Sequence, residues 1–467
     1  MTPTRDPVAV VGAGPAGLFQ ALYLSKVRGR NVVLIEQQET VGGILRGGQA
    51  PWGPVDQGAY IFQECGIAAL DDLFFDALPL DEWHILDGVR RDIGGNHFAG
   101  RIDTGSLFPD LRRLPAEDYR RCLDELKRCA EGRSLSIAEA PTLAAYLTAR
   151  FGPHAVSCFY DPLTRKFWKN SPETLSAAAA AMVHMTRVVA YDMKQSLAMK
   201  QSPGWNAILG VPDQLAFPLH LLSSSKRCLY PRSFGTINVV NGLVDALRRH
   251  GVQILTGTKI TGLETADNAV TGLQVTSRDG ARTVAVSGVL WASANPPLLG
   301  LMGLPVAPPA HPPVPHRLVH LLLDHVPQTG PLYWLWSYDP DTSWVRLSSG
   351  AAYCPDAARD GRYPICVETH IPAADTAPEE VVAQVEREMR AAHLISDATK
   401  VVAAYVQPGA QGYFVPSLGN CASLDAQRKA IERHAPVNLC LTGQDVAAGV
   451  FFLPDVLSAS LSALDRL

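Results

Sequence analysis

The sequence lacks several features that define common classes of protein. It contains no Cys-x-x-Cys motif, no long run of like charges and no apolar stretch long enough for a spanning helix. Its formal net charge of −4 offers no basic face to nucleic acid. The nine cysteines are scattered along the chain, so we predict free thiols in a reducing compartment, without a disulfide or a bound metal.

The remaining composition fits a protein with several packed cores. With 467 residues, 47% of them hydrophobic, we expect about two to three domains. Residues 1–7 lead into the first predicted strand without an apolar segment, so we expect no export signal and a cytoplasmic location. The expected partners are small molecules, with no nucleic acid and no transmembrane segment, and a homodimer stays open.

The most informative segment begins at Val8 and predicts a dinucleotide site. The apolar run Val8–Val11 is typical of a buried parallel strand, and glycines follow it at the spacing Gly-x-Gly-x-x-Gly. These glycines permit a tight turn, a close approach of backbone to pyrophosphate, and close helix packing. A helix expected over about 16–26 would direct its N-terminal N–H groups at the phosphates. The residues expected to contact the pyrophosphate are Gly12, Ala13, Gly14, Pro15, Ala16 and Gly17.

A second strand, expected over Val32–Ile35, is followed by an acidic residue. Glu36 lies 19 residues after Gly17, and its carboxylate can accept hydrogen bonds from the ribose hydroxyls of an adenosine, with Gln37 beside it. A 2′-phosphate would be repelled there, which disfavours NADP. The Gly42-Gly43 pair is a second segment without side chains. It indicates a cofactor larger than one nucleotide half and favours FAD over NAD.

With these residues the N-terminal segment resembles the flavin-dependent amine oxidase and protoporphyrinogen oxidase superfamily, whose members share the Glu-x5-Gly-Gly spacing found from Glu36 to Gly43. The resemblance implies a Rossmann-type domain that binds FAD. It also implies that Ile260, in a β-rich run, offers its backbone to the adenine. One departure concerns the chemistry. Amine oxidases commonly have a lysine near flavin N5 in this part of the chain, but this sequence has no lysine between Lys259 and Lys400.

The C-terminal segment carries a second cofactor signal. A strand expected over Val437–Gly443 is followed by a loop and by a helix that Pro454 opens. Such a helix could direct its N-terminus at the flavin and stabilise the negative charge of the reduced form. The loop holds no cysteine, so we expect non-covalent FAD. The residues expected to contact the cofactor here are Gly443, Asp445, Phe452 and Leu453.

The C-terminal half also resembles UDP-galactopyranose mutase and its relatives, which belong to the same superfamily. Arg346, followed by Glu368, matches a mutase-like pattern and implies an anionic substrate. Two departures argue against a mutase, since Gln444 and Ala448 stand where these enzymes have an arginine and a tyrosine used in or near sugar-nucleotide binding. The other matching segments are Tyr413–Pro416, Asn420 and Gly443–Leu461.

The order of the predicted elements gives an α/β protein with three parts. The Rossmann-type FAD-binding domain is segmented over residues 1–65, 226–300 and 430–467. A mainly helical substrate or lid domain over 66–225 is inserted into it, and a second β-sheet over 301–429 forms the substrate-binding domain. The helices expected in the inserted region lie within Leu107–Arg133, Leu143–Phe159 and Leu175–Tyr191.

Three side chains are the candidates for catalysis in the substrate cavity: Tyr60, Arg346 and Tyr413. Tyr60 lies in the segment Gly58–Phe62, which fits the mutase pattern except that mutases have a histidine in place of Tyr60. The expected apolar walls are Trp334 or Trp336 and Phe451 or Phe452, and the histidines expected to be ordinary core or surface residues include His184 and His370.

The preferred function is oxidation, dehydrogenation or desaturation of a small organic substrate, with specialised metabolism as one setting. Hydride transfer to flavin N5 needs binding, orientation and exclusion of water more than acid–base groups. The runner-up is a redox-neutral sugar-nucleotide mutase or isomerase that uses reduced FAD as a nucleophile. A third class, a protein that binds flavin without catalysis, stays open because the motifs report cofactor binding alone.

Overall fold

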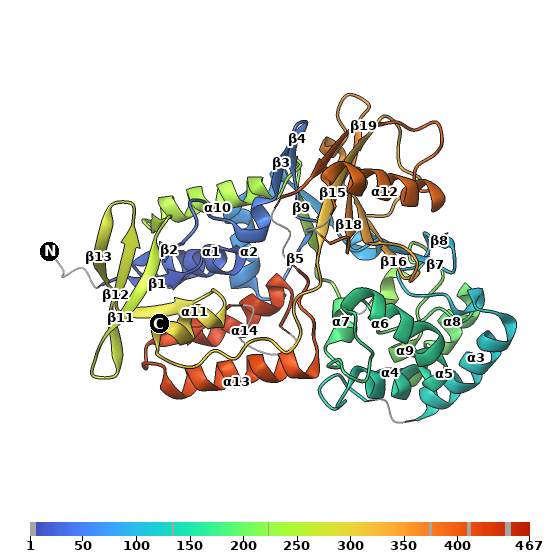
Figure 1. Ribbon diagram of the computed structural model, residues 1–467, viewed down its shortest axis with the longest axis horizontal. Coiled ribbons are helices and arrows are strands. Elements are labelled where there is room, and N and C mark those ends of the chain that lie inside the picture. Colours follow the sequence, from blue (N-terminus) through green and yellow to red (C-terminus); the bar gives the residue numbers. More distant parts are fainter. Residues whose placement is uncertain (1–5, 133–134, 223, 373–375, 409–411, 444–449) are drawn as a thin grey trace.

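The computed structural model describes residues 6–132, 135–222, 224–372, 376–408, 412–443 and 450–467. A parallel five-stranded sheet lies in the cofactor part of the molecule, and the chain returns to it after long excursions (Figure 1). Its strands lie in the order β10 (Gln253–Leu255), β2 (Val32–Ile35), β1 (Val8–Val11), β14 (Gly288–Trp291) and β20 (Leu439–Leu441).

Helices cover one face of this sheet, and a small antiparallel sheet with two more helices covers the other. The two layers follow from the period of a strand, because Val8 and Val10 of β1 join one core whereas Ala9 and Val11 join the other. The first face carries α1 (Pro15–Leu22), α2 (Ala68–Ala77), α10 (Ile237–Arg249) and α14 (Leu453–Arg466). The second face carries β11 (Lys259–Ala266), β12 (Ala269–Ser277), β13 (Gly280–Ala285), α11 (Asn295–Leu301) and α13 (Leu418–His434).

This arrangement confirms the predicted α/β fold class with a segmented Rossmann-type domain. Strands β1 and β2 occupy the predicted positions. The helix predicted over about 16–26 begins at Pro15 and is α-helical to Leu22, and a π-helical turn over Tyr23–Val27 completes it. The predicted parallel pairing is also present, since β1 lies between β2 and β14.

The second sheet has seven strands and lies apart from the first (Figure 1). All its neighbouring strands are antiparallel except β16 and β7. Helix α12 (Pro378–Ala391) packs against it and contributes to its core. The order is β19 (Val401–Val406), β15 (Arg317–Leu323), β18 (Tyr363–Thr369), β17 (Trp344–Ser349), β16 (Trp334–Ser337), β7 (Gly94–Phe98) and β8 (Arg101–Asp103).

Strands β7 and β8 come from the segment 66–225, for which the sequence predicts mainly helix. Strand β7 begins with two glycines that allow close packing: a Cβ on Gly94 would lie 2.6 Å from Trp334 Nε1, and one on Gly95 would lie 2.5 Å from the Asp103 carbonyl oxygen. A strand whose close packing depends on glycines shows no hydrophobic alternation in its sequence. The predicted domain boundaries stay a prediction. The remaining strands are β3 (Gly48–Ala50), β4 (Gly53–Val55), β5 (Phe62–Gln63), β6 (Trp83–Leu86) and β9 (Cys228–Pro231).

The third part is helical and has its own apolar core. The prediction of a helix over Leu175–Tyr191 is wrong except for one turn, because Val188 and Val189 form β-bridges with other segments. None of the described helices is both long and apolar enough to cross a bilayer. The helices here are α3 (Ala116–Glu131), α4 (Leu143–Phe151), α5 (Pro153–Ala155), α6 (Asp161–Trp168), α7 (Ala179–Met182), α8 (Met193–Met199) and α9 (Pro203–Ile208), with a π-helical turn over Val156–Tyr160.

A buried polar link ties the two ends of the cofactor domain together. Gln20 of α1 donates from Nε2 to the Thr442 carbonyl oxygen at 2.8 Å and accepts from the Thr442 hydroxyl at 2.8 Å. Gln20 Nε2 also lies 3.3 Å from Ser460 Oγ in α14. Because Thr442 follows β20, this link fixes the end of the last strand against the first helix.

The Gln20→Leu substitution should lower the free energy of unfolding by about 1–3 kcal/mol, because it leaves the buried groups of Thr442 without their partner. The Thr442→Val substitution should have a smaller effect, because it removes only the hydrogen bond of the hydroxyl and keeps the carbonyl that accepts from Gln20. The double variant should lose less than the sum of the two single losses, since both single variants remove the bond from the Thr442 hydroxyl to Gln20 Oε1. Denaturant unfolding of the four proteins measures this coupling, and strictly additive losses would show that the link is not cooperative.

Candidate functional site

The turn after β1 has the geometry that a pyrophosphate site requires. Gly12 adopts a positive φ of 97°, a conformation that favours glycine. A Cβ on Gly17 would lie only 1.8 Å from the Gly12 carbonyl oxygen, so the third glycine of the motif allows α1 to pack onto the turn. The first turn of α1 carries neither a side-chain cap nor an acidic residue. Its N–H groups are therefore placed to meet an anion.

The two glycine segments meet at the start of this helix. A Cβ on Gly14 would meet no atom of the described residues within 4 Å, whereas one on Gly43 would lie 3.1 Å from Gly14 Cα. Gly42 adopts φ 112°, and its N–H donates to the Ala13 carbonyl oxygen at 2.7 Å. Open space borders Gly14, which is what close approach of a phosphate needs. We call residues 12–17 together with Gly42 and Gly43 the cofactor cradle, and its geometry fits the FAD predicted from the sequence.

Glu36 lies beside the cofactor cradle at the end of β2. Its Oε2 accepts a hydrogen bond from the Ala13 N–H at 2.7 Å, and its Oε1 accepts one from the Gln38 N–H at 2.9 Å. The loop before β11 comes to the same place, because the Thr258 N–H donates to the Glu36 carbonyl oxygen at 2.9 Å. Ile260 follows this loop and is partly buried. The structure thus brings the segment that contains Ile260 beside Glu36, and Gln37, the next residue, is exposed.

The C-terminal cofactor residues lie partly within the described chain. Gly443 packs against the residues that follow the neighbouring strand β14, since its Cβ would lie 3.0 Å from the Ser293 carbonyl oxygen. Phe452 and Leu453 open α14, and the Phe452 N–H donates to the Asp455 carboxylate at 3.2 Å. This carboxylate offsets the positive end of the helix, a feature the sequence reasoning did not include. Asp445 lies outside the described residues, and the contact of this helix with flavin stays a prediction.

A buried group of polar side chains lies on the second sheet. Arg346 of β17 and Glu368 of β18 stand opposite each other in register, and Arg346 Nε donates to Glu368 Oε1 at 2.6 Å. The Tyr413 hydroxyl donates to Glu368 Oε2, and His316 Nε2 lies 3.6 Å from the same oxygen. The His316 and His370 rings are 6.4 Å apart. We call Arg346, Glu368, Tyr413, His316 and His370 the polar cluster.

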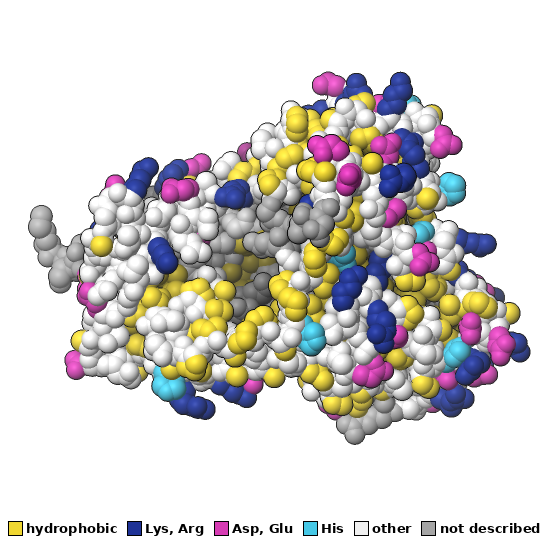
Figure 2. All heavy atoms as spheres, in the orientation of Figure 1, with side chains coloured by type: hydrophobic (Ala, Val, Ile, Leu, Met, Phe, Trp, Pro, Cys, Tyr) yellow, Lys and Arg dark blue, Asp and Glu magenta, His cyan; other side chains and the backbone are white. Residues whose placement is uncertain are grey.

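A segment of the cofactor domain lies against the polar cluster. A Cβ on Gly58 would be 2.7 Å from Glu368 Oε1, and the Ala59 N–H points at the same oxygen from 3.4 Å. The segment is held by buried Asp56, which accepts from the Thr236 N–H at 2.7 Å and from the Tyr230 hydroxyl at 2.6 Å. The polar cluster is therefore attached to the domain that contains the cofactor cradle. Figure 2 shows a hollow in the molecular surface where that domain meets the other two parts.

The three catalytic candidates are only partly brought together. Arg346 and Tyr413 share Glu368 as a partner. Tyr60 follows the segment that touches Glu368, but its ring packs edge-on against Phe62 at 5.1 Å and joins the core of the cofactor domain. Burial raises the pKa of the Tyr60 hydroxyl, so it stays protonated. A catalytic role for these residues stays a prediction.

Burial and charge pairing fix the protonation states of the ion pair. Burial alone would raise the pKa of Glu368, but the charge of Arg346 and the hydrogen bonds from Arg346 and Tyr413 outweigh it and lower the pKa. Burial and the Glu368 charge raise the pKa of Tyr413. At neutral pH the cluster therefore holds a carboxylate, a guanidinium and a neutral phenol. The Arg346 guanidinium also lies over the Trp336 ring, 5.0 Å from its centre.

The histidines near the cluster are neutral. Burial, together with the Arg346 charge, lowers the pKa of His184 to about 4, and burial with the neighbouring His316 lowers that of His370 to about 3. His316 Nδ1 and His370 Nε2 are buried without a hydrogen-bond partner among the described residues. The expectation that His370 is an ordinary core or surface residue is therefore wrong for its Nε2, which has no hydrogen-bond partner among the described residues. Sequence reasoning missed His316 altogether, because an isolated histidine carries no pattern.

Two family models and one curated relative match parts of the chain. A family model for NAD(P)-binding Rossmann-like domains matches residues 10–74, and one for FAD dependent oxidoreductases matches residues 217–420. A curated relative, hydroxyneurosporene desaturase from Rubrivivax gelatinosus, is 34% identical over 106 residues, which is 23% of this chain and 20% of the desaturase. The match thus spans only a fifth of that relative's length.

Solved structures share the fold over nearly the whole chain. Reduced UDP-galactopyranose mutase has a TM-score of 0.73 at 18% identity, covering 99% of this chain and 95% of that one. A protein described as a protoporphyrinogen oxidase from Exiguobacterium has a TM-score of 0.67 at 16% identity, with coverage of 100% and 99%. Putrescine oxidase has a TM-score of 0.58 at 16% identity, covering 99% of each chain.

These comparisons confirm the predicted resemblance. Residues 217–420 are similar to FAD dependent oxidoreductases, and this match together with the shared fold identifies FAD as the cofactor. The structural neighbours differ in the reactions that their names describe, and at under 25% identity they define the fold alone. The reaction must therefore be argued from the side chains of the site.

Two glycines of the cofactor cradle allow a matched test of the FAD site. Gly14→Ala should leave the fold intact and weaken FAD binding at least about tenfold, because its Cβ would enter the open space beside the helix N-terminus. Gly17→Ala should destabilise the protein even without FAD, since its Cβ would overlap the Gly12 carbonyl oxygen. Gly300→Ala, also in open space but in α11, is the control. Circular dichroism and FAD fluorescence titration measure both effects; unchanged FAD affinity in Gly14→Ala would place the cofactor elsewhere.

Acid should destabilise the protein through His184. Its folded pKa of about 4 lies below that of an unfolded histidine at about 6.5, so the unfolded state binds the proton first. This contribution to stability is complete above about pH 6.5 and is lost as the pH falls toward 4, by roughly 2 kcal/mol between pH 7 and pH 5.

The His184→Asn variant tests this assignment. Asparagine tolerates the left-handed backbone at this position, where φ is 52°. Denaturant unfolding at several pH values should show a flatter pH dependence for this variant than for the wild type. The exposed His250→Asn serves as the control and should follow the wild type. Parallel curves for wild type and His184→Asn would rule out His184 as the source.

Proposed function

We propose that this protein oxidises or desaturates a small organic substrate by transfer of a hydride to FAD, with the substrate held at the polar cluster. The observation that supports the proposal is the contact between the cluster and the cofactor domain, in which Glu368 lies against Gly58 and Ala59. Buried polar groups are costly unless they find partners, and two ring nitrogens here find none among the described residues. A polar substrate would supply them.

The side chains of the cluster suit binding and orientation. Bound FAD would supply the acceptor for two electrons at its N5. Glu368 holds the Arg346 guanidinium, whose side chain is 21% exposed and can still meet a polar group of a substrate. The neutral rings of His316 and His370 each leave one nitrogen to bond a hydroxyl or an amine. The Trp336 ring limits water on one side of the guanidinium.

A redox-neutral sugar-nucleotide mutase is the second candidate. The shared fold with reduced UDP-galactopyranose mutase favours it. The charge balance of the cluster weighs against it, because the Arg346 guanidinium is paired with the Glu368 carboxylate at 2.6 Å. A neutral pair offers little net attraction to a diphosphate. The two positions that depart from the mutase pattern, Gln444 and Ala448, lie outside the described residues.

Anaerobic absorbance titration of the purified holoprotein distinguishes these functions. Amines, alcohols, porphyrinogens and UDP-sugars are added in turn while the flavin spectrum is recorded. Bleaching of oxidised flavin by one of the first three classes is the expected result and identifies the substrate class. Turnover of a UDP-sugar only after the flavin has been reduced chemically would establish the mutase instead. Flavin that no compound bleaches and that supports no turnover would indicate binding without catalysis.

The neutral double variant Arg346→Met with Glu368→Gln tests the role of the polar cluster. It should keep the fold and the bound FAD while slowing flavin reduction by substrate at least about 100-fold, or roughly 3 kcal/mol, because the groups that orient the substrate are gone. Arg346→Met alone should instead destabilise the protein by about 3–5 kcal/mol, since it leaves a buried carboxylate unpaired.

Tyr363→Phe is the matched control for that experiment, because Tyr363 lies on the same strand as Glu368 but at its other end. The substrate should reduce the flavin of this variant at the wild-type rate. Anaerobic stopped-flow absorbance gives the rate constants, and unfolding curves give the stabilities. If the flavin of the double variant were reduced as fast as that of the wild type, the polar cluster would have no role in the reaction.

A further inference from the structure

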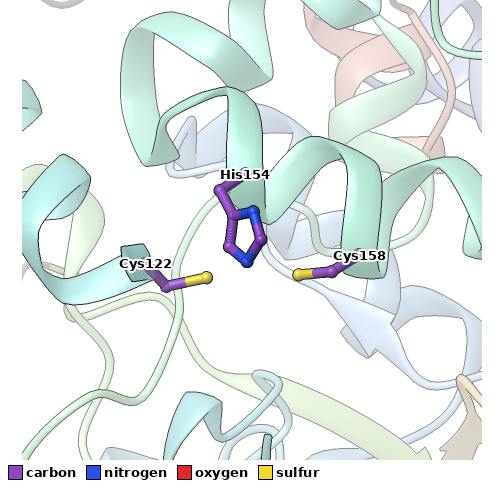
Figure 3. Close-up of side chains that lie close together, drawn as sticks. All are labelled: Cys122, His154 and Cys158. Carbon is purple, nitrogen blue, oxygen red and sulfur yellow. The ribbon is translucent and has the colours of Figure 1, made fainter. Parts of the chain in front are cut away.

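The helical part of the molecule brings together three side chains that could share a metal ion. Cys122 lies on α3, His154 on α5, and Cys158 on the π-helical turn that continues α5. The potential ligand atoms of the three all lie within 4.8 Å of one another. Figure 3 shows the two thiols pointing toward each other with the imidazole ring of His154 between them. The sequence analysis predicts no metal site, because these residues do not form a familiar cysteine motif.

A fourth potential ligand lies one turn before Cys122. Asp118 Oδ1 is 2.9 Å from His154 Nε2. Ligand atoms in a tetrahedral zinc site are about 3.3–3.8 Å apart, given metal–ligand distances of about 2.0–2.3 Å. Asp118 and His154 are therefore closer than a shared ion requires. Asp118 is outside the group whose ligand atoms all lie within 4.8 Å of one another, so its carboxylate would have to move toward the thiols to serve as a fourth ligand. Asp118 and Cys122 on α3, like His154 and Cys158, are four residues apart and so share one helix face.

The surroundings hold these side chains in place. Cys122 is completely buried, and the His154 side chain is 11% exposed. The Glu125 carboxylate accepts a hydrogen bond from the His154 N–H at 2.8 Å, which fixes the start of α5 against α3. Cys122 is the buried ligand, whereas His154 and Cys158 are half-buried. Ligands held by packed helices are preorganised, whereas a chance surface cluster is not.

We propose that Cys122, His154 and Cys158, with Asp118 as the fourth ligand, bind a structural Zn²⁺ ion. Two thiolates, one imidazole and one carboxylate form the donor set that zinc accepts in tetrahedral geometry. Four protein ligands leave no open position, so the ion would not take part in the redox reaction. Its effect is to link α3 to α5 and the turn that follows, and thereby to stabilise the helical part.

Zinc binding by the full-length protein tests the proposal. The protein is purified under reducing conditions, stripped with a chelator and titrated with Zn²⁺ against a chromophoric competitor, and bound metal is counted by mass spectrometry. The expected result is one zinc per chain and a higher melting temperature with zinc than without. Cys158→Ser and His154→Gln should each weaken binding at least about 100-fold, and Asp118→Asn about tenfold.

Cys129→Ser is the matched control, because Cys129 lies on the same helix as Cys122 but outside the cluster. It should bind zinc like the wild type. Equal binding by wild type and Cys158→Ser would mean an adventitious site and would overturn the proposal. So would a Cys122–Cys158 disulfide in freshly prepared protein that binds no zinc after reduction.

Cobalt substitution in the wild type keeps the test valid if a variant fails to fold. Co²⁺ bound by thiolates in a tetrahedral site gives intense visible and near-ultraviolet absorption that octahedral Co²⁺ lacks. Such a spectrum, saturating at one Co²⁺ per chain and abolished by Zn²⁺, is the expected outcome. A spectrum of Co²⁺ in water alone would refute thiolate ligation.

Discussion

The parallel pairing of β1 with β2 and β14 is the constraint on which the rest of the structure depends. Strand β1 lies in the middle of its sheet, and its partner β14 comes more than 270 residues later in the chain. Between them the chain leaves the sheet to form the helical part and part of the second sheet. It must then return in register, so those insertions are anchored at both ends. The Gln20–Thr442 link adds the same constraint for β20.

This pairing also explains where the chemistry can occur. All five strands of the cofactor sheet run parallel, and ligands bind such sheets at the carboxyl ends of their strands. Gly12 follows β1, Glu36 follows β2, and Thr442 follows β20 at that edge. The segment around Gly58 leaves this region and touches Glu368. One chain segment therefore joins the cofactor cradle to the polar cluster, and the ion pair is buried at the junction.

The cofactor cradle could be predicted from the sequence because its physics is local. The positive φ of Gly12 and the contact of Gly17 with the Gly12 carbonyl arise within six residues, so the spacing itself carries the geometry. The α/β fold class follows from the same segment and from the strands that return to it. The helix predicted over Leu175–Tyr191 fails because distant β-bridges override local propensity there.

The polar cluster could be predicted only in part. Arg346, Glu368 and Tyr413 were accessible through resemblance. Their contact with one another depends on strand register, and a bridge between Val314 and Tyr413 sets His316 beside the phenol. Such contacts leave no periodic pattern of hydrophobic residues in the sequence. The candidate zinc ligands did leave a signal, since Asp118 and Cys122, like His154 and Cys158, repeat at four-residue spacing. That signal gains meaning only when two helices are known to pack together.

We propose that the cofactor cradle and the polar cluster are two ends of one active site. A crystal structure of the FAD complex with a compound that bleaches the flavin tests this claim most directly. The account predicts pyrophosphate at Gly14, and a substrate that contacts the polar cluster and holds its reacting carbon about 3–3.5 Å from flavin N5. A flavin ring directed away from Arg346 and Glu368, with the substrate bound elsewhere, would contradict it.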